Sequence, residues 1–353
     1  MPPSSNRGVW MRAVVVGYYG FGNSGDEALL LTLMQQLPES VEPVVLSNDP
    51  ARTAELYGVE TCDRWNLRNI HRLFRSADAF IWGGGSLMQD SSSWRNPLYY
   101  GGLMRWAQMY ELTTIAWGQG IGPLQRGWVR WLTRSCLQRC ESVSVRDEGA
   151  ARLLQTWGIA HKLAPDPVWS LSATDYQPDW ESPAIAVVLR HHPLLTPARL
   201  NTIQRALDIL QAQTNAQLLL MPFQATDVDL AQSMQGACQA SSRVVRIEDP
   251  RQLMAAFGSV KLAIAMRLHG LILAAAAGIP VFGLSYDPKV KLLMEAEQIP
   301  GYELEQLPED ERELAEAWLK QYRREGLSAI ELGALRERAA IHADCLRNGL
   351  SKI

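Results

Sequence analysis

Short apolar runs alternate with amphipathic stretches along most of the chain. Residues 12–17 and 79–82 have the length and the apolar content of strands, whereas residues 26–37 repeat leucines every three or four positions, as a helix does. After an interruption, the alternation restarts at residue 184. This pattern is typical of βα units with parallel strands and predicts an α/β protein.

A polar segment with two prolines, residues 170–183, interrupts the alternation and is expected to be a linker. We predict two doubly wound, Rossmann-like domains, one over 11–169 and the other over 184–300. The remaining C-terminal segment, 301–353, is predicted to form helices. Two such domains are expected to have a central cleft at the carboxyl ends of their strands, where doubly wound folds bind ligands.

Composition excludes several classes of protein. The 353 residues are 47% hydrophobic and 20% charged, as expected for a globular chain with two cores. The net charge of −3 gives no general attraction to nucleic acid, so an anion site requires a local basic cluster. Five cysteines without CxxC spacing favour neither disulfides nor a metal site. Since no signal peptide or membrane-spanning run is evident, we expect a cytoplasmic protein.

Three glycine-rich segments come directly after predicted strands of the first domain, at 17–27 (GYYGFGNSGDE), 83–90 (GGGSLMQD) and 117–123 (WGQGIGP). Glycines at strand ends let the backbone approach a ligand. A dinucleotide site fits poorly because GxGxxG does not match in register. A tight structural turn is the alternative for the first segment. The candidate ligand-binding residues, which suit a hydroxyl-rich ligand, are Asn23, Asp26, Gly84, Gly85, Asp90 and Gln119.

Basic residues come after the predicted strands of the second domain. Arg190 ends one strand, Arg267 and His269 lie in the turn RLHG before a helix, and Lys289 follows the next strand. Together with the amino end of the helix near Gly270, these residues could bind one small, multiply charged anion. A histidine at such a junction also suits proton transfer.

Seven segments together resemble the polysaccharide pyruvyl transferase family, namely GYYGFGNSGDEALL, IWGGGSLMQD, AWGQGIGPL, SVRDEGA, APDPVW, AMRLHGLILAAAAGIP and YDPKVK. They are most similar to its S-layer-anchoring branch, which pyruvylates cell-wall polysaccharide. The resemblance covers residues 12–298 and implies a glycosyltransferase-B-like fold. By motif match, RLHG supplies Arg267 and His269, SVRD supplies Arg146, and YDPK supplies Lys289.

The resemblance also implies phosphoenolpyruvate as the donor substrate, without a further cofactor, and a pair of glycan hydroxyls as the acceptor. Arg146, Arg190, Lys289 and Gly270 are then donor-binding candidates, and His269 and Arg267 are catalytic candidates. The second domain is expected to bind the donor and the first the acceptor. Whether His269 acts as an acid or as a base stays open. The alternatives are a sugar-nucleotide-dependent glycosyltransferase of the same fold and a catalytically silent glycan-binding protein.

A predicted helix over 126–139 contains four arginines, two tryptophans and no acidic residue. Such a helix can rest on an anionic membrane surface, which would suit an acceptor glycan still attached to a lipid carrier. The alternative is a solvated surface helix whose tryptophans lie in the core. The sequence does not indicate the acceptor sugar or the oligomeric state.

Overall fold

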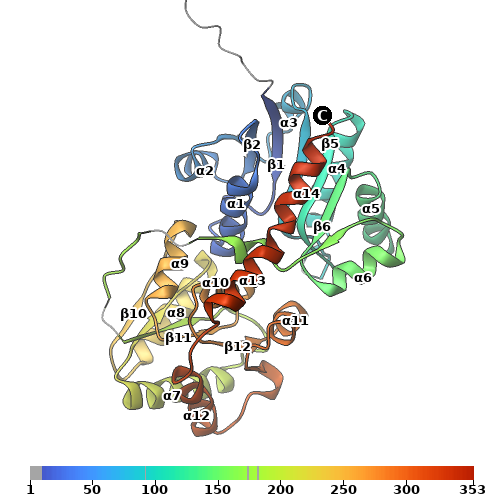
Figure 1. Ribbon diagram of the computed structural model, residues 1–353. Helices are drawn as coiled ribbons and strands as arrows, with labels where there is room; N and C mark the ends of the chain where they lie inside the picture. Colours follow the sequence, from blue (N-terminus) through green and yellow to red (C-terminus); the bar gives the residue numbers. More distant parts are fainter. Residues whose placement is uncertain (1–9, 92, 173–174, 181–182) are drawn as a thin grey trace, which may run out of the picture. The chain divides into compact units, whose positions relative to one another are not determined.

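The computed structural model describes residues 10–91, 93–172, 175–180 and 183–353, and it divides the chain into two compact units (Figure 1). The first unit contains the chain up to Phe21, Asp26–Ser170 and Arg336–Ile353. The second contains Gly22–Gly25 and Leu171–Leu335. Part of the expected linker, residues 173–174 and 181–182, lies outside the described residues.

Within the described residues, the first unit contains a seven-stranded parallel sheet with the order β3-β2-β1-β4-β5-β6-β7. The strands are Met11–Val16 (β1), Val41–Ser47 (β2), Glu60–Asp63 (β3), Ala79–Met88 (β4), Thr113–Ile121 (β5), Ser142–Val145 (β6) and Lys162–Leu163 (β7). The direction of strand order reverses between β1 and β4. Doubly wound folds bind ligands at the carboxyl edge beside such a reversal.

Helices cover both faces of this sheet. They are α1 (Ser24–Gln36), α2 (Pro50–Tyr57), α3 (Leu67–Phe74), α4 (Arg95–Met109), α5 (Gly127–Leu137), α6 (Glu148–Thr156) and α14 (Ile341–Leu350). Helices α3 to α6 share one core with the sheet, in which Phe74, Met104 and Leu154 are buried. On the other face lies α14, where Gly349 packs against Ile115. The last helix of the chain therefore completes the first unit.

The second unit contains a parallel sheet with the order β10-β9-β8-β11-β12-β13. Its strands are Ala184–Val188 (β8), Gln217–Leu220 (β9), Ser242–Val244 (β10), Leu262–Ala265 (β11), Val281–Ser285 (β12) and Gly301–Glu303 (β13). Its helices are α7 (Pro197–Thr214), α8 (Val228–Ala237), α9 (Pro250–Gly258), α10 (Leu268–Ala276), α11 (Pro288–Ala296) and α12 (Glu311–Tyr322). Helix α13 (Ala329–Ala339) contains the division between the units.

Helices α7, α8 and α12 share a core with one face of the second sheet, and α10 packs against β11 and β12. The predicted α/β class, with two doubly wound parallel sheets, is thus confirmed. The expectation of helices alone after residue 300 is wrong at Gly301–Glu303, which pair with β12. A Cβ at Gly301 would lie 2.1 Å from the carbonyl oxygen of Gly283, so only glycine permits this pairing.

Two of the three glycine-rich segments are parts of strands rather than loops after them. Strand β4 continues through Gly83–Gly85, and β5 continues through Gly118 and Gly120. The pairing of β4 with β5 shifts register between Gly85 and Met88. Since Gly84, Gly85 and Gly118 all have positive φ, glycine is what lets these strands bend and continue.

Candidate functional site

Three neighbouring strands of the second sheet end in the basic residues that the sequence singled out. Arg190 follows β8, the pair Arg267 and His269 follows β11, and Lys289 follows β12. In the sheet β11 lies between β8 and β12. Because parallel strands end at the same edge, these residues gather at the carboxyl edge of the second sheet.

Arg190 contacts Tyr286 across the end of β11. Its Nη1 donates to the Tyr286 hydroxyl at 2.9 Å, and its guanidinium carbon lies 5.2 Å from the centre of the tyrosine ring. Tyr286 also packs against His192, whose pKa is lowered by burial and by the Arg190 cation. The turn of residues 267–269 therefore lies between the segments that carry Arg190 and Tyr286.

Arg267 is buried and paired. Its Nη2 donates to Gln224 Oε1 at 2.9 Å and to the Asp227 carboxylate at 2.5 and 2.6 Å. The Nε of Arg267 and the Nε of Arg190 are both buried and have no hydrogen-bond partner among the residues that the structure describes. A buried donor without a partner costs free energy, and such groups persist mainly where a ligand or a water satisfies them. Two arginines on adjacent strands thus each keep one donor for an anion.

His269 lies in the first turn of α10, beside residues from the beginning of the chain. The segment Gly22–Gly25 belongs to the second unit, where the Ser24 amide donates to the Phe223 carbonyl at 2.9 Å. A Cβ built at Gly25 would lie 2.2 Å from His269 Nδ1. The N-cap residue, Arg267, makes no side-chain capping bond to α10. The amino end of α10 is therefore available to an anion next to an imidazole.

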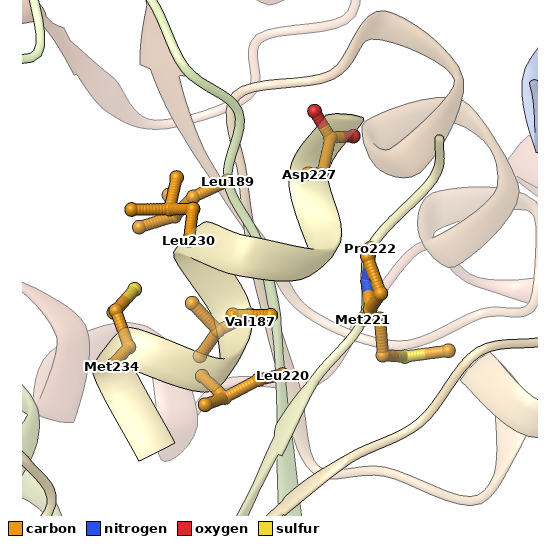
Figure 2. A pocket seen from close by; sticks show the side chains of 9 residues that line it. Val187, Leu189, Leu220, Met221, Pro222, Asp227, Leu230 and Met234 are labelled. Carbon is orange, nitrogen blue, oxygen red and sulfur yellow. The ribbon is translucent and has the colours of Figure 1, made fainter. Parts of the chain in front are cut away.

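Figure 2 shows a pocket of a different character in the same unit. It lies among apolar side chains of β8, β9 and α8, including Val187, Leu220 and Leu230. Its carboxylate, Asp227, is paired with Arg267. Because the lining is apolar, this pocket does not fit a multiply charged anion.

In the first unit, packing explains two of the three consecutive glycines for which the sequence favoured a ligand. The Tyr19 hydroxyl donates to the Gly83 carbonyl, and a Cβ at Gly83 would lie 2.2 Å from that hydroxyl oxygen. A Cβ at Gly84 would lie 3.0 Å from the Trp117 ring. Gly83 and Gly84 are therefore accounted for by packing within the protein.

Two acceptor candidates are buried and bound within the protein. Both Asp90 carboxylate oxygens accept backbone N–H groups, from Gln125 at 2.7 Å and from Arg126 at 2.8 Å. Burial alone would raise the pKa of Asp90, but these bonds outweigh it and the pKa is lowered. Gln119 donates its amide to the Trp117 carbonyl at 2.9 Å. These contacts give Asp90 a structural role in the loop after β4 and Gln119 a structural role within β5.

Of the remaining first-unit candidates, Asp26 is more accessible, whereas the side chain of Arg146 is buried. Asp26 is half-buried, and its Oδ1 would lie 3.3 Å from a Cβ at Gly85. Arg146 is held by Asp166 Oδ2 at 2.5 Å and donates to Ser86 Oγ at 3.2 Å. In the second unit, Asn23 accepts the Gly25 amide at 3.1 Å.

An aromatic cluster that sequence reasoning missed surrounds Arg64 at the carboxyl edge of the first sheet. The Arg64 guanidinium is buried, donates to the Gly17 carbonyl at 3.0 Å, and lies within 5.4 Å of four rings, those of Phe21, Trp65, Tyr99 and Tyr100. Trp65 is 59% exposed. The signal was weak because β3 (ETCD) has little apolar content and gave no strand prediction.

The described residues contain no group of three or more histidine, cysteine or acidic side chains that could hold a metal.

Comparisons with known proteins give the family. A comparison with curated protein sequences found no match.

The chain is similar in fold to the UDP-GlcNAc 2-epimerase of Neisseria meningitidis bound to UDP-GlcNAc, with 11% identity, a TM-score of 0.61, and coverage of 97% of this chain and 100% of that chain. It is also similar to HepE of Anabaena in complex with UDP-glucose, with 9% identity, a TM-score of 0.59, and coverage of 97% and 100%. These likenesses support a glycosyltransferase-B-like fold. The family model of the polysaccharide pyruvyl transferases matches residues 23–288, so the chain belongs to that family.

Proposed function

We propose that the protein transfers a pyruvyl group from phosphoenolpyruvate to two hydroxyls of a sugar in a cell-wall or surface polysaccharide precursor, forming a pyruvate ketal. The observation that carries this proposal is the pair of buried, unpartnered Nε donors of Arg190 and Arg267 on adjacent strands. Phosphoenolpyruvate carries a phosphate and a carboxylate close together. Two arginines and the uncapped amino end of α10 match such a ligand in size and charge.

The chemistry requires few groups. Carbon 3 of the donor gains a proton and becomes a methyl group, while an acceptor hydroxyl adds to carbon 2 and loses its proton. The phosphate then leaves with the electrons of the carbon–oxygen bond, and the second hydroxyl adds to carbon 2, gives its proton to the departing phosphate and closes the ketal. His269, at the amino end of α10, is the group proposed to transfer a proton. Arg190 and Arg267 stabilise the charge on the phosphate, with Lys289 as a further cation.

On the acceptor side, the proposal combines the half-buried Asp26 with the aromatic cluster around Arg64. Aromatic rings pack against the apolar faces of sugars, and Trp65 offers an exposed ring beside the polar side chain of Asn48, which accepts from its indole N–H at 3.3 Å. Both groups lie at the carboxyl edge of the first sheet. By the resemblance in sequence, the acceptor is a cell-wall glycan of the kind that anchors an S-layer.

The test is release of inorganic phosphate by the purified protein from phosphoenolpyruvate and a cell-wall glycan fragment, with the ketal identified by mass spectrometry. We expect His269→Ala to lower turnover by about a hundredfold or more with unchanged thermal unfolding. His161→Ala is a matched control, since His161 lies outside this cluster and its Nδ1 contacts the Ile159 carbonyl at 2.9 Å. Wild-type turnover by a folded His269→Ala protein would exclude the proposed role.

The rival function is sugar-nucleotide-dependent glycosyl transfer, because the similar structures bind UDP or UDP-sugars. Isothermal titration separates the two. The proposal requires that phosphoenolpyruvate binds, that Arg190→Ala weakens this binding, and that UDP does not compete. Tight binding of UDP together with no binding of phosphoenolpyruvate would favour the rival.

A further inference from the structure

Two adjacent helices of the first unit, α4 and α5, carry exposed aromatic and basic side chains. Their large exposed apolar residues include Trp94 (47% exposed), Leu98 (51%), Trp128 (41%) and Trp131 (69%). Residues 91–140 contain six arginines and a single acidic residue, Glu111. Glu111 lies beyond the carboxyl end of α4, whereas Trp94 is at its amino end. Within this stretch of the chain, the exposed indoles are therefore accompanied by basic rather than acidic side chains.

On α5, tryptophans and arginines share the outward face. Trp128, Arg130, Trp131 and Arg134 are exposed, and their spacing of three and four residues places them on one side of the helix. The opposite side, including Val129, is buried. The alternative in which these tryptophans lie in the core is therefore wrong. An isolated exposed tryptophan is ordinary, but two on one turn with two arginines are not explained by packing.

Helix α4 extends this face. A Cβ at Gly101 would lie 2.6 Å from Leu132, so the two helices touch at this point. Both helices follow strands of one parallel sheet and run in the same direction. One turn earlier on each helix lie Leu98 and Trp128, both exposed, so each helix carries an exposed apolar side chain near its amino end. We call Trp94, Leu98, Trp128, Arg130, Trp131 and Arg134 the α4/α5 surface.

The charge of this surface is not balanced internally. Arg126 Nη1 lies 3.4 Å from the Asp90 carboxylate and donates to the Asp90 carbonyl, so its charge is compensated. Arg130 donates to the Leu124 carbonyl at 3.1 Å, which leaves its charge uncompensated. Among the described residues, neither Arg130 nor Arg134 has a carboxylate partner.

We propose that the α4/α5 surface docks on an anionic lipid bilayer. Indoles prefer the boundary between lipid headgroups and acyl chains, and arginines are attracted by anionic headgroups, so the two residue types complement one membrane surface. A nucleic acid or an acidic protein would match the arginines, but the exposed aliphatic Leu98 on the same surface and the net charge of −3 of the whole chain favour a bilayer. No helix in the described ranges is long and apolar enough to cross a bilayer, so the contact is peripheral.

Docking here would bring a lipid-attached acceptor to the carboxyl edge of the first sheet. Both helices begin at that edge, where Asp90 joins the loop after β4 to the start of α5. Only this consequence rests on the proposed function. The binding of lipid follows from the surface itself.

The test is co-sedimentation of the full chain with vesicles of phosphatidylcholine, alone or mixed with phosphatidylglycerol, at low ionic strength. We expect binding to the anionic vesicles only. The double variant Arg130→Glu and Arg134→Glu should weaken it by at least about a hundredfold, because it changes the charge of the surface by four units. The matched control, Arg323→Glu and Arg324→Glu, makes the same charge change at exposed positions of the second unit and should leave vesicle binding nearly unchanged.

A second variant separates the role of the indoles from that of the charge. Trp131→Ser should reduce vesicle binding about tenfold or more while the dependence on salt persists. The proposal is overturned if the wild type ignores anionic vesicles at low salt, if both double variants lose binding equally, or if the protein binds RNA or an acidic peptide but no vesicle. Phosphate release with a water-soluble glycan fragment should be the same in the Arg130→Glu and Arg134→Glu variant as in the wild type. If the wild type binds vesicles but releases no phosphate, the proposed function fails and the docking surface stands.

Discussion

The absence of a side chain at Gly25 leaves room for the imidazole of His269. A methyl group at this position would lie 2.2 Å from the imidazole Nδ1, closer than any real contact. Gly25→Ala should therefore displace the imidazole and lower turnover in the phosphate-release assay by about tenfold or more, since proton transfer requires geometry within a hydrogen bond. The variant should still fold, because alanine favours helices and Gly25 lies in the first turn of α1.

Gly236→Ala is the control for this substitution. Gly236 is also helical, lies in α8, and has open space where its Cβ would be. We expect turnover like that of the wild type and an increase in the free energy of unfolding of up to about 1 kcal/mol. Equal turnover in the two alanine variants would show that His269 can move without cost, or that it takes no part in the reaction.

A substitution of Tyr286 tests whether its hydrogen bond with Arg190 positions that arginine for binding the donor. Tyr286→Phe keeps the ring beneath the guanidinium but removes the hydroxyl that accepts from Arg190 Nη1. One hydrogen bond is worth about 0.5–1.5 kcal/mol, so the KM for phosphoenolpyruvate should rise about twofold to tenfold. The kcat should stay within about twofold, because Tyr286 positions a donor-binding residue. A loss confined to kcat, with KM unchanged, would contradict this assignment.

At the scale of elements, α14 is joined to the first sheet through His342. Its Nε2 donates to the Pro165 carbonyl at 2.8 Å, and its Nδ1 accepts from the Ser144 hydroxyl at 2.9 Å. Burial lowers the pKa of His342 to about 4, so the folded protein keeps the ring neutral at a pH where the unfolded chain binds a proton. Stability is therefore lost as the pH falls from about 6.5 toward 4.

This shift predicts a measurable pH dependence. Between pH 7 and pH 5, His342 should contribute a loss of about 2 kcal/mol in the free energy of unfolding. His342→Gln lacks that contribution. The difference in unfolding free energy between wild type and variant, from urea titrations at the two pH values, should shrink by about this amount at pH 5. A constant difference would mean that His342 is not buried in its neutral form.

The order of elements could be predicted from the sequence because each strand and helix has its own apolar pattern. The short edge strands β3 and β7 could not be predicted, since they contain few apolar residues. The glycine-rich segments were placed after strands because glycine usually ends them. In β4 the glycines instead make room for Tyr19 and the Trp117 ring, and in β5 Gly118 makes room for Pro167, which are contacts between residues distant in sequence.

The candidate site was partly predictable for the same reason. Basic residues at the ends of β8, β11 and β12 can be identified from the amino-acid sequence alone once the strands have been predicted. The pairing of Arg267 with Asp227 could not be predicted from the sequence, because Asp227 lies forty residues away in the loop after β9. Nor could the contact between Gly25 and His269, which joins a segment near the start of the chain to the second unit.

At the scale of the whole molecule, the division into two units does not follow the order of residues along the chain. The first unit is formed largely by the first 170 residues but is completed by residues 336–353. Helix α14 buries His342, Ala343, Cys345, Leu346, Gly349 and Leu350. Its two leucines alone are worth about 1.5–3 kcal/mol each, and a domain is stable by only about 5–15 kcal/mol.

A chain that ends at Ala340 should therefore lose much of the stability of its first unit. We expect the lowest-temperature unfolding transition, followed by circular dichroism, to move down by at least about 10 °C. Limited proteolysis with mass spectrometry should place the new cleavage sites in residues 26–170 rather than in 183–335. The control ends at Ser351 and removes only Lys352 and Ile353, which are exposed, so that the surface ion pair between Lys352 and Glu141 is the main loss. If the two truncated chains unfold at the same temperature, α14 covers the first sheet without stabilising it.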